Sequence, residues 1–339
     1  MSAEPLKTLF HPFEAEAVPL PGKGDRALFL GAEPGFRPPE GFGAELHLVQ
    51  GFRPHFRALQ ASGLIVTAQA EGGGFDMALV LAGRHRGLNE LRLAEALERV
   101  APGGLIVIAG GKDDGIASLR KRVGELVPLE GHLPKYHGIA FWFRRPADPA
   151  ATQNLRAANH ALLVEGRFRT APGMFSFDRI DTGSRLLVEN LPDDLRGSVA
   201  DFCAGWGYVA AEIAARAPGI SALDLYEADF ASLEAAKLNL AAVGQSITRE
   251  FFWTDLLKEP VEKRYDAIAM NPPFHRSRAA EPEIGAGMIR AAAKALKPGG
   301  RLFMVANRQL PYEPVLSAAF SSHAELARDG MFKVLVARR

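Results

Sequence analysis

In the second half of the chain, apolar runs typical of strands alternate with segments whose apolar residues have helical spacing. Four apolar runs have the length and composition of buried strands, and the first ends in a glycine-rich turn: 199–207, 222–227, 265–270 and 297–305. Between them, residues 228–243 and 285–296 place apolar side chains at helical spacing. Strands that alternate with helices predict a parallel β-sheet covered by helices on both faces.

The first half repeats this order of segments. Its strand-like runs are 27–35, 46–50, 75–80 and 101–108. The offset between matched residues grows steadily along the chain, which indicates a first copy that is shorter than the second but keeps the same order. We therefore predict a duplicated α/β domain, with chance similarity of apolar strands as the alternative.

The polar residues of the second copy are missing from the first. Gln50 stands where the second copy has Glu227, and Leu81 stands where it has Asn271. Pro34 interrupts the first glycine turn and removes a backbone N–H from it. A binding site depends on such donors and acids, whereas a fold depends only on its strands. We therefore expect the chemistry to lie in the second half.

The length of the chain agrees with two domains. A chain of 339 residues has room for about two hydrophobic cores. We expect a first domain over 1–145, a connection over 146–170 and a catalytic domain over 171–339.

Charge and cysteine content narrow the class of protein. Lys and Arg (40) balance Asp and Glu (39), so nucleic-acid binding would need a local basic patch. The single cysteine excludes a disulfide framework and a multi-cysteine zinc site, and it suits a reducing compartment. The N-terminus lacks the order of a signal peptide, and no run reaches about 18 apolar residues. We expect a cytoplasmic protein with no membrane span and no metal.

A glycine-rich turn follows the first strand of the second copy. Gly205 and Gly207 match the pattern G-x-G-x-x-A, in which glycines permit a tight turn and close approach of a ligand. Glu227 follows about 20 residues later, and its carboxylate suits a ribose diol. The pattern predicts a nucleoside cofactor. It fits a dinucleotide-dependent dehydrogenase as well as an enzyme that uses S-adenosylmethionine (SAM), and a turn that binds nothing stays open.

Asp255 lies at the end of the expected third strand. At such a strand end its carboxylate could accept a hydrogen bond from an adenine amino group. The same position suits an N-cap for a helix in the segment that follows. Spacing alone favours neither interpretation.

The segment Asn271-Pro272-Pro273-Phe274 directly follows the strand 265–270, at the carboxyl end of the sheet. The Asn271 side-chain oxygen and the Pro272 carbonyl can both accept hydrogen bonds from one planar –NH2 group. Phe274 offers a ring on which a base can stack, an interaction of about 1–3 kcal/mol. Holding both protons orients the nitrogen lone pair and stabilises positive charge as it develops. The motif favours methylation of an exocyclic amine over hydride transfer, with a proline-stiffened loop as the structural alternative.

These residues resemble the class I SAM-dependent methyltransferases, and more narrowly the bacterial ribosomal-RNA guanine-N2 methyltransferases with an eroded N-terminal copy of the catalytic domain. The segments that carry the resemblance are 172–176, 181–184, 271–275, 305–312 and 330–334. The resemblance implies an α/β fold of two tandem Rossmann-like domains, each with a seven-stranded, mostly parallel sheet, the first degenerate. It also implies SAM as the cofactor. The implied partner is ribosomal RNA or a ribosomal subunit, and the small subunit fits better than the large one.

The resemblance gives each matching residue a role. Asp201, Gly205 and Gly207 would line the methionine end of SAM, Glu227 would hold the ribose and Asp255 the adenine. The target amine would be held by the segment Asn271-Pro272-Pro273-Phe274. Asn271 would also contact the cofactor. Two features of the glycine turn depart from the family pattern, Trp206 in place of a small residue and Cys203-Ala204 in place of Gly-Cys.

A guanine must leave its helix to reach such a pocket, so we expect phosphate contacts beside it. Arg276 and Arg278 are the nearest candidates in sequence. Further candidates in the first half are 84–86, Lys112, 120–122, Lys135 and 144–145, each of which equally suits a solvated surface. Two other functions stay open: methylation of another planar amine (adenine N6 or a protein glutamine), and a non-catalytic RNA-binding factor in ribosome assembly.

Overall fold

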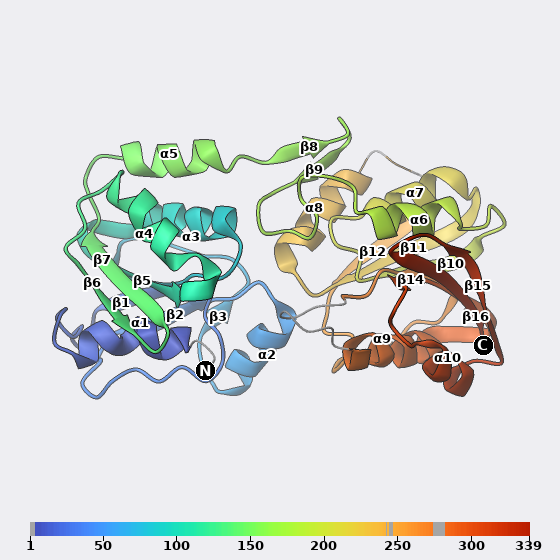
Figure 1. Ribbon diagram of the computed structural model, residues 1–339, viewed down its shortest axis with the longest axis horizontal. Coiled ribbons are helices and arrows are strands. Elements are labelled where there is room, and N and C mark those ends of the chain that lie inside the picture. Colours follow the sequence, from blue (N-terminus) through green and yellow to red (C-terminus); the bar gives the residue numbers. More distant parts are fainter. Residues whose placement is uncertain (1–3, 242, 244–246, 274–281) are drawn as a thin grey trace. The chain divides into compact units, whose positions relative to one another are not determined.

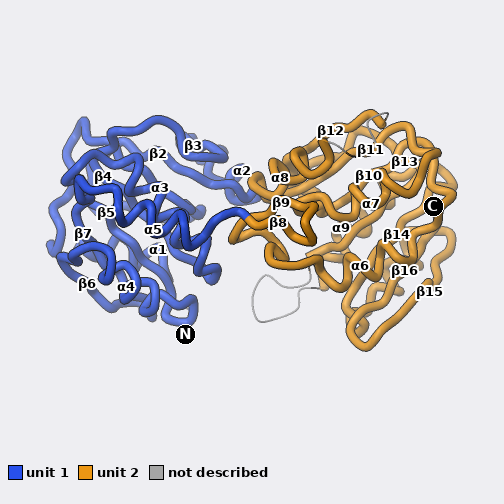
Figure 2. Tube along the Cα trace, turned by 90° about the horizontal axis from the view of Figure 1, so that it is seen from above, with its two compact units in different colours: residues 1–161 blue, residues 162–339 orange. Residues whose placement is uncertain are grey.

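The computed structural model describes residues 4–241, 243, 247–273 and 282–339. The chain divides into two compact units, unit 1 (Met1–Ala161) and unit 2 (Leu162–Arg339), which are coloured separately in Figure 2. Each unit contains a seven-stranded sheet of its own. The prediction of two α/β domains with mostly parallel sheets is therefore confirmed.

The sheet of unit 1 has the strand order β3-β2-β1-β4-β5-β7-β6. The first five strands in this order pair in parallel, and β7 is antiparallel to both of its neighbours. The elements of unit 1 (Figure 1) are α1 (Pro5–Glu14), β1 (Arg26–Leu30), β2 (Glu45–Val49), α2 (Arg53–Ala61), β3 (Val66–Thr67), β4 (Phe75–Leu81), α3 (Arg86–Arg99), β5 (Val100–Gly111), the 3₁₀ turn η1 (Lys112–Asp114), α4 (Ile116–Gly124), β6 (Gly131–Lys135), β7 (Gly138–Arg144) and α5 (Ala150–Ala158).

The sheet of unit 2 has the corresponding order β12-β11-β10-β13-β14-β16-β15, with β16 antiparallel to β14 and β15. A separate two-stranded sheet pairs β8 with β9. The elements of unit 2 are β8 (Leu162–Val164), β9 (Phe168–Thr170), α6 (Thr182–Glu189), β10 (Arg196–Phe202), α7 (Tyr208–Arg216), β11 (Gly219–Glu227), α8 (Phe230–Leu240), β12 (Thr248–Trp253), β13 (Tyr265–Met270), α9 (Pro282–Ala295), β14 (Leu296–Asn307), α10 (Glu313–Ala319), β15 (Ser322–Arg328) and β16 (Phe332–Arg338).

The central strands of the two sheets match residue by residue at their carboxyl ends. Leu30 pairs with Val49 and Val80 in unit 1, as Phe202 pairs with Tyr226 and Met270 in unit 2. The residues that follow these strands therefore correspond, so that Gln50 matches Glu227 and Leu81 matches Asn271, as the sequence pattern predicted.

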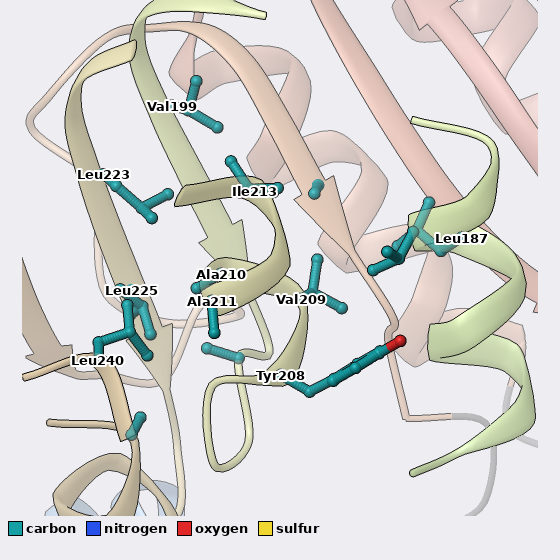
Figure 3. Packing of buried hydrophobic residues seen from close by; sticks show 14 of the residues in the cluster. Leu187, Val199, Tyr208, Val209, Ala210, Ala211, Ile213, Leu223, Leu225 and Leu240 are labelled. Carbon is teal, nitrogen blue, oxygen red and sulfur yellow. The ribbon is translucent and has the colours of Figure 1, made fainter. Parts of the chain in front are cut away.

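Side chains of unit 2 alternate between two cores because successive residues of a strand point to opposite faces. Val199 of β10 and Leu223 of β11 lie in one apolar cluster with residues of α6, α7 and α8, and Figure 3 shows them in one view with Leu187, Val209 and Leu240. Residues of the opposite parity, such as Ala200 and Phe202, pack with α9 and α10 on the other face. The strand ends that carry the polar residues are thereby held between two apolar layers.

Residues 146–170, expected as a connection, are divided between the units. Ala151 and Leu155 lie four residues apart on α5 and are buried in a core of unit 1. The hairpin β8–β9 belongs to unit 2, where Asn239 of α8 accepts from the Arg169 N–H at 2.7 Å and donates to its carbonyl at 3.0 Å. Most of this segment is therefore regular structure attached to one unit or the other. Within the described part of the chain no helix is long and apolar enough to cross a membrane.

Candidate active site

Three strands of unit 2 end at one edge of the sheet and bring distant polar residues together. Asp201 lies near the end of β10, Glu227 ends β11, and Asn271 follows β13. Since these strands are parallel neighbours in the sheet, their carboxyl ends meet at the same edge. The backbone N–H of Thr254, which follows β12, donates to the Glu227 carbonyl at 2.9 Å and brings the neighbouring Asp255 to this edge as well.

The two glycines of the turn are required for different reasons. Gly207 has a φ of +88°, and a Cβ atom there would lie 2.7 Å from Leu240 Cδ1. Gly205 has a φ of +55°, but a Cβ atom there would meet nothing within 4 Å. Gly207 is thus fixed by close packing of the turn on α8, whereas Gly205 provides a left-handed backbone beside open space.

The departures from the family pattern in this turn leave its backbone intact. Cys203 adopts a φ of +60°, a conformation that favours glycine, and burial raises the pKa of its thiol so that the group stays neutral. The Trp206 indole is buried against Phe168 and donates to the Phe175 carbonyl at 2.8 Å. A bulky residue is therefore accommodated by the apolar core beneath the turn.

Glu227 connects the glycine turn to the start of α8. One carboxylate oxygen accepts from the Gly205 N–H at 2.7 Å and the other from the Asp229 N–H at 2.8 Å. Burial raises the pKa of the Glu227 carboxyl to about 7, although both N–H groups favour the ionised form. Each oxygen of a carboxylate can accept a second hydrogen bond, so the group retains the acceptors that a vicinal diol requires.

Asp201 is the most deeply buried acid at this edge, with 1% of its surface exposed. Its carboxylate accepts from the Ala210 N–H at 3.0 Å and so ties β10 to the first turn of α7. Burial raises the pKa of the Asp201 carboxyl to about 8, and the nearby charge of Glu227 acts in the same direction. Two acids with raised pKa values in one site favour a positively charged ligand, because a cation stabilises both ionised forms.

The side chain of Asn271 is held in a single orientation. Its amide nitrogen donates to Ser184 Oγ at 2.8 Å and to Asp181 Oδ2 at 3.1 Å. A carboxylate can only accept hydrogen bonds, so the –NH2 group must face Asp181. Both amide protons are then used within the protein, and the carbonyl oxygen Oδ1 is left as the functional group that Asn271 can offer to a ligand.

Asp181 also begins α6, where its carboxylate caps the helix by accepting from the Ser184 N–H at 2.8 Å. Neither Asp181 nor Ser184 was predicted as a site residue, although both lie in a segment that carries the family resemblance. The sequence signal that could have identified them is the N-cap pattern, but that pattern gives no sign of the partner 90 residues away.

A narrow cavity joins the glycine turn to Asn271. The residues that line it are Phe175, Ser176, Asp181, Ser184, Cys203, Ala204, Gly205, Trp206, Tyr208, Val209 and Asn271. It therefore contains an open glycine backbone at one side and the oriented amide at the other, which is an arrangement that can place a small cofactor group against a substrate amine.

Asp255 has a structural partner at each of its polar groups. Its carboxylate accepts from the Leu257 N–H at 3.0 Å, and its own N–H donates to Glu259 Oε2 at 2.8 Å. The Asp255 carboxylate thus caps the turn at 256–258, as an N-cap would. No helix follows, because this turn does not continue. A contact with adenine stays a prediction.

Several predicted contact residues lie outside the described residues: Phe274, Arg276 and Arg278. Pro272, which is buried, and Pro273, which is exposed, follow Asn271 directly. Among the basic candidates of unit 1, Arg84 and Arg86 form ion pairs with Asp114 and Glu90. Arg122 and Arg144 also pair with acids, whereas Lys112, Arg120, Lys121 and Lys135 form no ion pair within the described ranges.

Comparison with known proteins agrees with this geometry. Residues 165–336 match the family model described as methyltransferase small domain. The ribosomal RNA small subunit methyltransferase C of Klebsiella pneumoniae is 32% identical over 260 residues, which cover 72% of this chain and 70% of the relative. Its counterpart from Escherichia coli O7:K1 is 31% identical over 246 residues, with the same coverage.

A solved structure matches both units. The T. thermophilus 16S rRNA N2 G1207 methyltransferase, in complex with AdoMet and guanosine, has a TM-score of 0.77 and 25% identity to this chain. The match covers 100% of this chain and 94% of that one. The resemblance drawn from the sequence is thereby confirmed, and the dehydrogenase alternative is set aside. The chain belongs to the methyltransferase small domain family, in its ribosomal RNA small subunit methyltransferase C branch.

Proposed function

We propose that this enzyme transfers a methyl group from SAM to the exocyclic N2 amine of a guanine in small-subunit ribosomal RNA. The observation that carries the proposal is the orientation of Asn271, whose amide protons are both used by Asp181 and Ser184. The T. thermophilus relative, solved with AdoMet and guanosine, supports the same cofactor and base. An rRNA substrate also implies that the enzyme acts in the cytoplasm, where ribosomal subunits are present.

The residues at the sheet edge fit SAM. Glu227 has free acceptor positions for the ribose hydroxyls, and Asp255 lies at the adjoining strand end for the adenine amine. Asp201 and the open backbone at Gly205 suit the positively charged methionine end. When bound, SAM supplies a methyl group on a sulfonium centre, which is the electrophile that a weakly nucleophilic amine requires.

The amine is activated by position rather than by a strong base. Asn271 Oδ1 and the Pro272 carbonyl accept the two N–H groups of the guanine amine. Stacking of the base on Phe274 stays a prediction from the sequence motif. The nitrogen lone pair is then directed away from the acceptors, and the positive charge that develops on nitrogen is stabilised by both oxygens. After transfer the methylated amine loses one proton to solvent, so neither a metal nor a buried general base is needed.

The test uses the full chain, labelled SAM and 16S rRNA or small subunits from cells that lack the enzyme. We expect label in N2-methylguanosine after digestion, and loss of that label with Asn271→Ala. The matched control is Asn154→Ala, an exposed asparagine of α5 in unit 1 that should leave transfer unchanged. Label in N6-methyladenosine or in protein would overturn the substrate assignment, and full activity of Asn271→Ala would overturn the role of the motif.

The two alternative functions are less well supported. A planar adenine or glutamine amide fits the same acceptors, but the relatives are named as ribosomal RNA methyltransferases. A non-catalytic assembly factor would have no need of an oriented Asn271 beside an acidic cofactor edge. Unit 1 shows how such a site looks when these residues are lost.

A further inference from the structure

A second cluster of cations lies in unit 1, at the turn between β6 and β7. Tyr136 and His137 form this turn, beside α1 and the end of β5 (Figure 1). The turn borders an open cavity of about 570 Å³. The residues that line the cavity are Glu4, Lys112, Pro134, Lys135, Tyr136, His137 and Gly138. We define the Tyr136 patch as Lys7, Lys112, Lys135, Tyr136 and His137.

The charges of the Tyr136 patch are largely uncompensated. Lys112 and Lys135 are exposed and form no ion pair within the described part of the chain. Glu4 is the only acid among the described lining residues, and it pairs with Lys7. A cavity bordered by free ammonium groups with one neutralised acid favours an anionic ligand.

An aromatic ring stands among these cations. The ammonium groups of Lys135 and Lys7 lie 5.8 and 5.9 Å from the Tyr136 ring centroid, and the His11 ring packs edge-on against it at 5.8 Å. These contacts hold the ring in place while it remains partly exposed. Cations beside a partly exposed ring match a phosphate backbone that carries bases and sugars better than they match an isolated anion.

The backbone of the turn is unfavourable for the residues it contains. Tyr136 and His137 have φ values of +52° and +56°, and two-residue hairpin turns of this kind strongly prefer Asn-Gly. Backbone strain at non-glycine residues persists mainly where the side chains serve a function. The choice of Tyr and His at this turn therefore needs an explanation beyond the fold.

The corresponding turn of unit 2, between β15 and β16, contains residues that are common in turns. Lys112 N–H donates to the His137 carbonyl at 3.0 Å, and the matching Arg308 N–H donates to the Met331 carbonyl at 2.8 Å. In unit 2 the turn contains Gly330, and the Asp329 side chain accepts from the N–H groups of the two residues after Gly330 at 2.7 and 2.6 Å. The Asp and Gly of unit 2 have no counterpart in the shorter turn of unit 1, which presents two rings instead.

From these observations we infer that the Tyr136 patch binds a ribose-phosphate segment of the ribosomal RNA substrate, separately from the site of methyl transfer. The inference rests on the proposed function in taking rRNA as the substrate. Lys112 and Lys135 contact phosphate oxygens, and Tyr136 with His137 contacts a sugar or an unstacked base. A contact on unit 1 then raises the effective concentration of rRNA at unit 2, because both units belong to one chain.

The main test compares two pairs of lysine substitutions in the full chain. Lys112→Ala with Lys135→Ala removes the two unpaired lysines of the patch, and Lys23→Ala with Lys294→Ala removes two exposed lysines outside it, one in each unit. Binding of labelled 16S rRNA is measured without SAM at several salt concentrations. We expect the substitutions in the patch to weaken binding about tenfold. The plot of the logarithm of the binding constant against the logarithm of salt concentration should become less steep by about 1.5, as for two lost phosphate contacts. Equal losses in both pairs, or none, would overturn the proposal.

The kinetic measurement separates this proposal from the proposed function. With the patch pair we expect a higher KM for rRNA, an unchanged kcat and unchanged SAM affinity. Absence of methyl transfer by the wild-type chain would contradict the proposed function while leaving the RNA-binding result readable, since binding is measured without SAM. Loss of binding to assembled subunits with full binding to naked rRNA would overturn the proposal in favour of a ribosomal protein partner.

A second variant removes the rings and relieves the turn. Tyr136→Asn with His137→Gly installs the favoured turn residues, so the melting temperature should rise. We expect RNA binding to weaken in the same variant. A purely structural role of the two rings would not produce higher stability together with weaker binding. A higher melting temperature with unchanged RNA affinity would overturn the part assigned to the rings.

Discussion

The two units have the same sheet but differ in what lies at its carboxyl edge. In unit 2, Glu227 accepts a hydrogen bond from the glycine turn through an oxygen that can accept another. In unit 1, the matching Gln50 donates to the Ala32 carbonyl at 2.6 Å and accepts from the Phe52 N–H at 2.8 Å. Exchange of one oxygen for –NH2 therefore replaces an acceptor with a donor that is used within unit 1, and the strand keeps its place in the sheet.

Two further differences close the site in unit 1. The buried Phe29 stands at the strand position of Asp201. The Arg92 guanidinium lies against Gly31, 2.6 Å from where a Cβ atom would be, and donates to the Leu81 carbonyl at 2.8 Å. By the strand register Gly31 matches Cys203, so a guanidinium lies in unit 1 where unit 2 has a neutral thiol. A fold therefore tolerates loss of its site, because apolar strand packing does not depend on the polar edge.

The largest effect is expected when unit 2 is given the residue of unit 1 at the amine site. Asn271→Leu should lower the rate of methyl transfer roughly 10²- to 10³-fold, as for loss of one preorganised polar group in an active site. The fold should persist because Leu81 occupies the same position in unit 1. Single-turnover rates and a thermal melt measure both. A rate near that of the wild type would show that Asn271 does not hold the amine.

The next effect is on the cofactor. Glu227→Gln copies Gln50, and we expect SAM affinity to fall about 10- to 100-fold, since a hydrogen bond to a charged group contributes about 1.5–3 kcal/mol. The reverse change, Gln50→Glu, should create no second SAM site because Phe29 and Arg92 remain. Calorimetric titration gives both affinity and stoichiometry. Two sites in Gln50→Glu would contradict this account of unit 1.

A smaller effect tests the orientation of Asn271. Asp181→Asn keeps a good N-cap for α6 but can also donate, so the Asn271 amide is no longer forced to face it with –NH2. We expect kcat to fall about tenfold, with SAM affinity unchanged and unfolding free energy altered by less than about 0.5 kcal/mol. Equal losses of stability and activity would instead indicate a structural role for Asp181 alone.

The last prediction concerns pH. The pKa values of about 7 for Glu227 and about 8 for Asp201 lie above those of the unfolded chain, so the ligand-free fold loses stability as pH rises from about 4 to 8. Cationic SAM favours the ionised acids, so its affinity should rise over pH 6–8 by at most about tenfold per unit for each proton released. Calorimetric titration with SAM in two buffers of different ionisation enthalpy measures the number of protons released on binding. Affinity that is flat with pH in the wild type would contradict the raised pKa values.

The amino-acid sequence alone determined the duplication, the α/β fold and the half that carries the chemistry. These follow from the period of apolar residues and from the position of short motifs after strands, because parallel strands end at one edge whatever fills the core. Even the match of Gln50 with Glu227 follows from the order of segments along the chain. Local order along the chain was sufficient for each of these conclusions.

Tertiary structure decided which polar atoms are free. The bonds from Asp181 and Ser184 to Asn271, the position of Arg92 against Gly31 and the cations around Tyr136 join segments that are far apart in the chain. A sequence pattern gives the period of an element but not the partner of a side chain. That partner is set by how distant elements pack, and the packing determines whether a carboxylate, an amide or a ring is left available to a ligand.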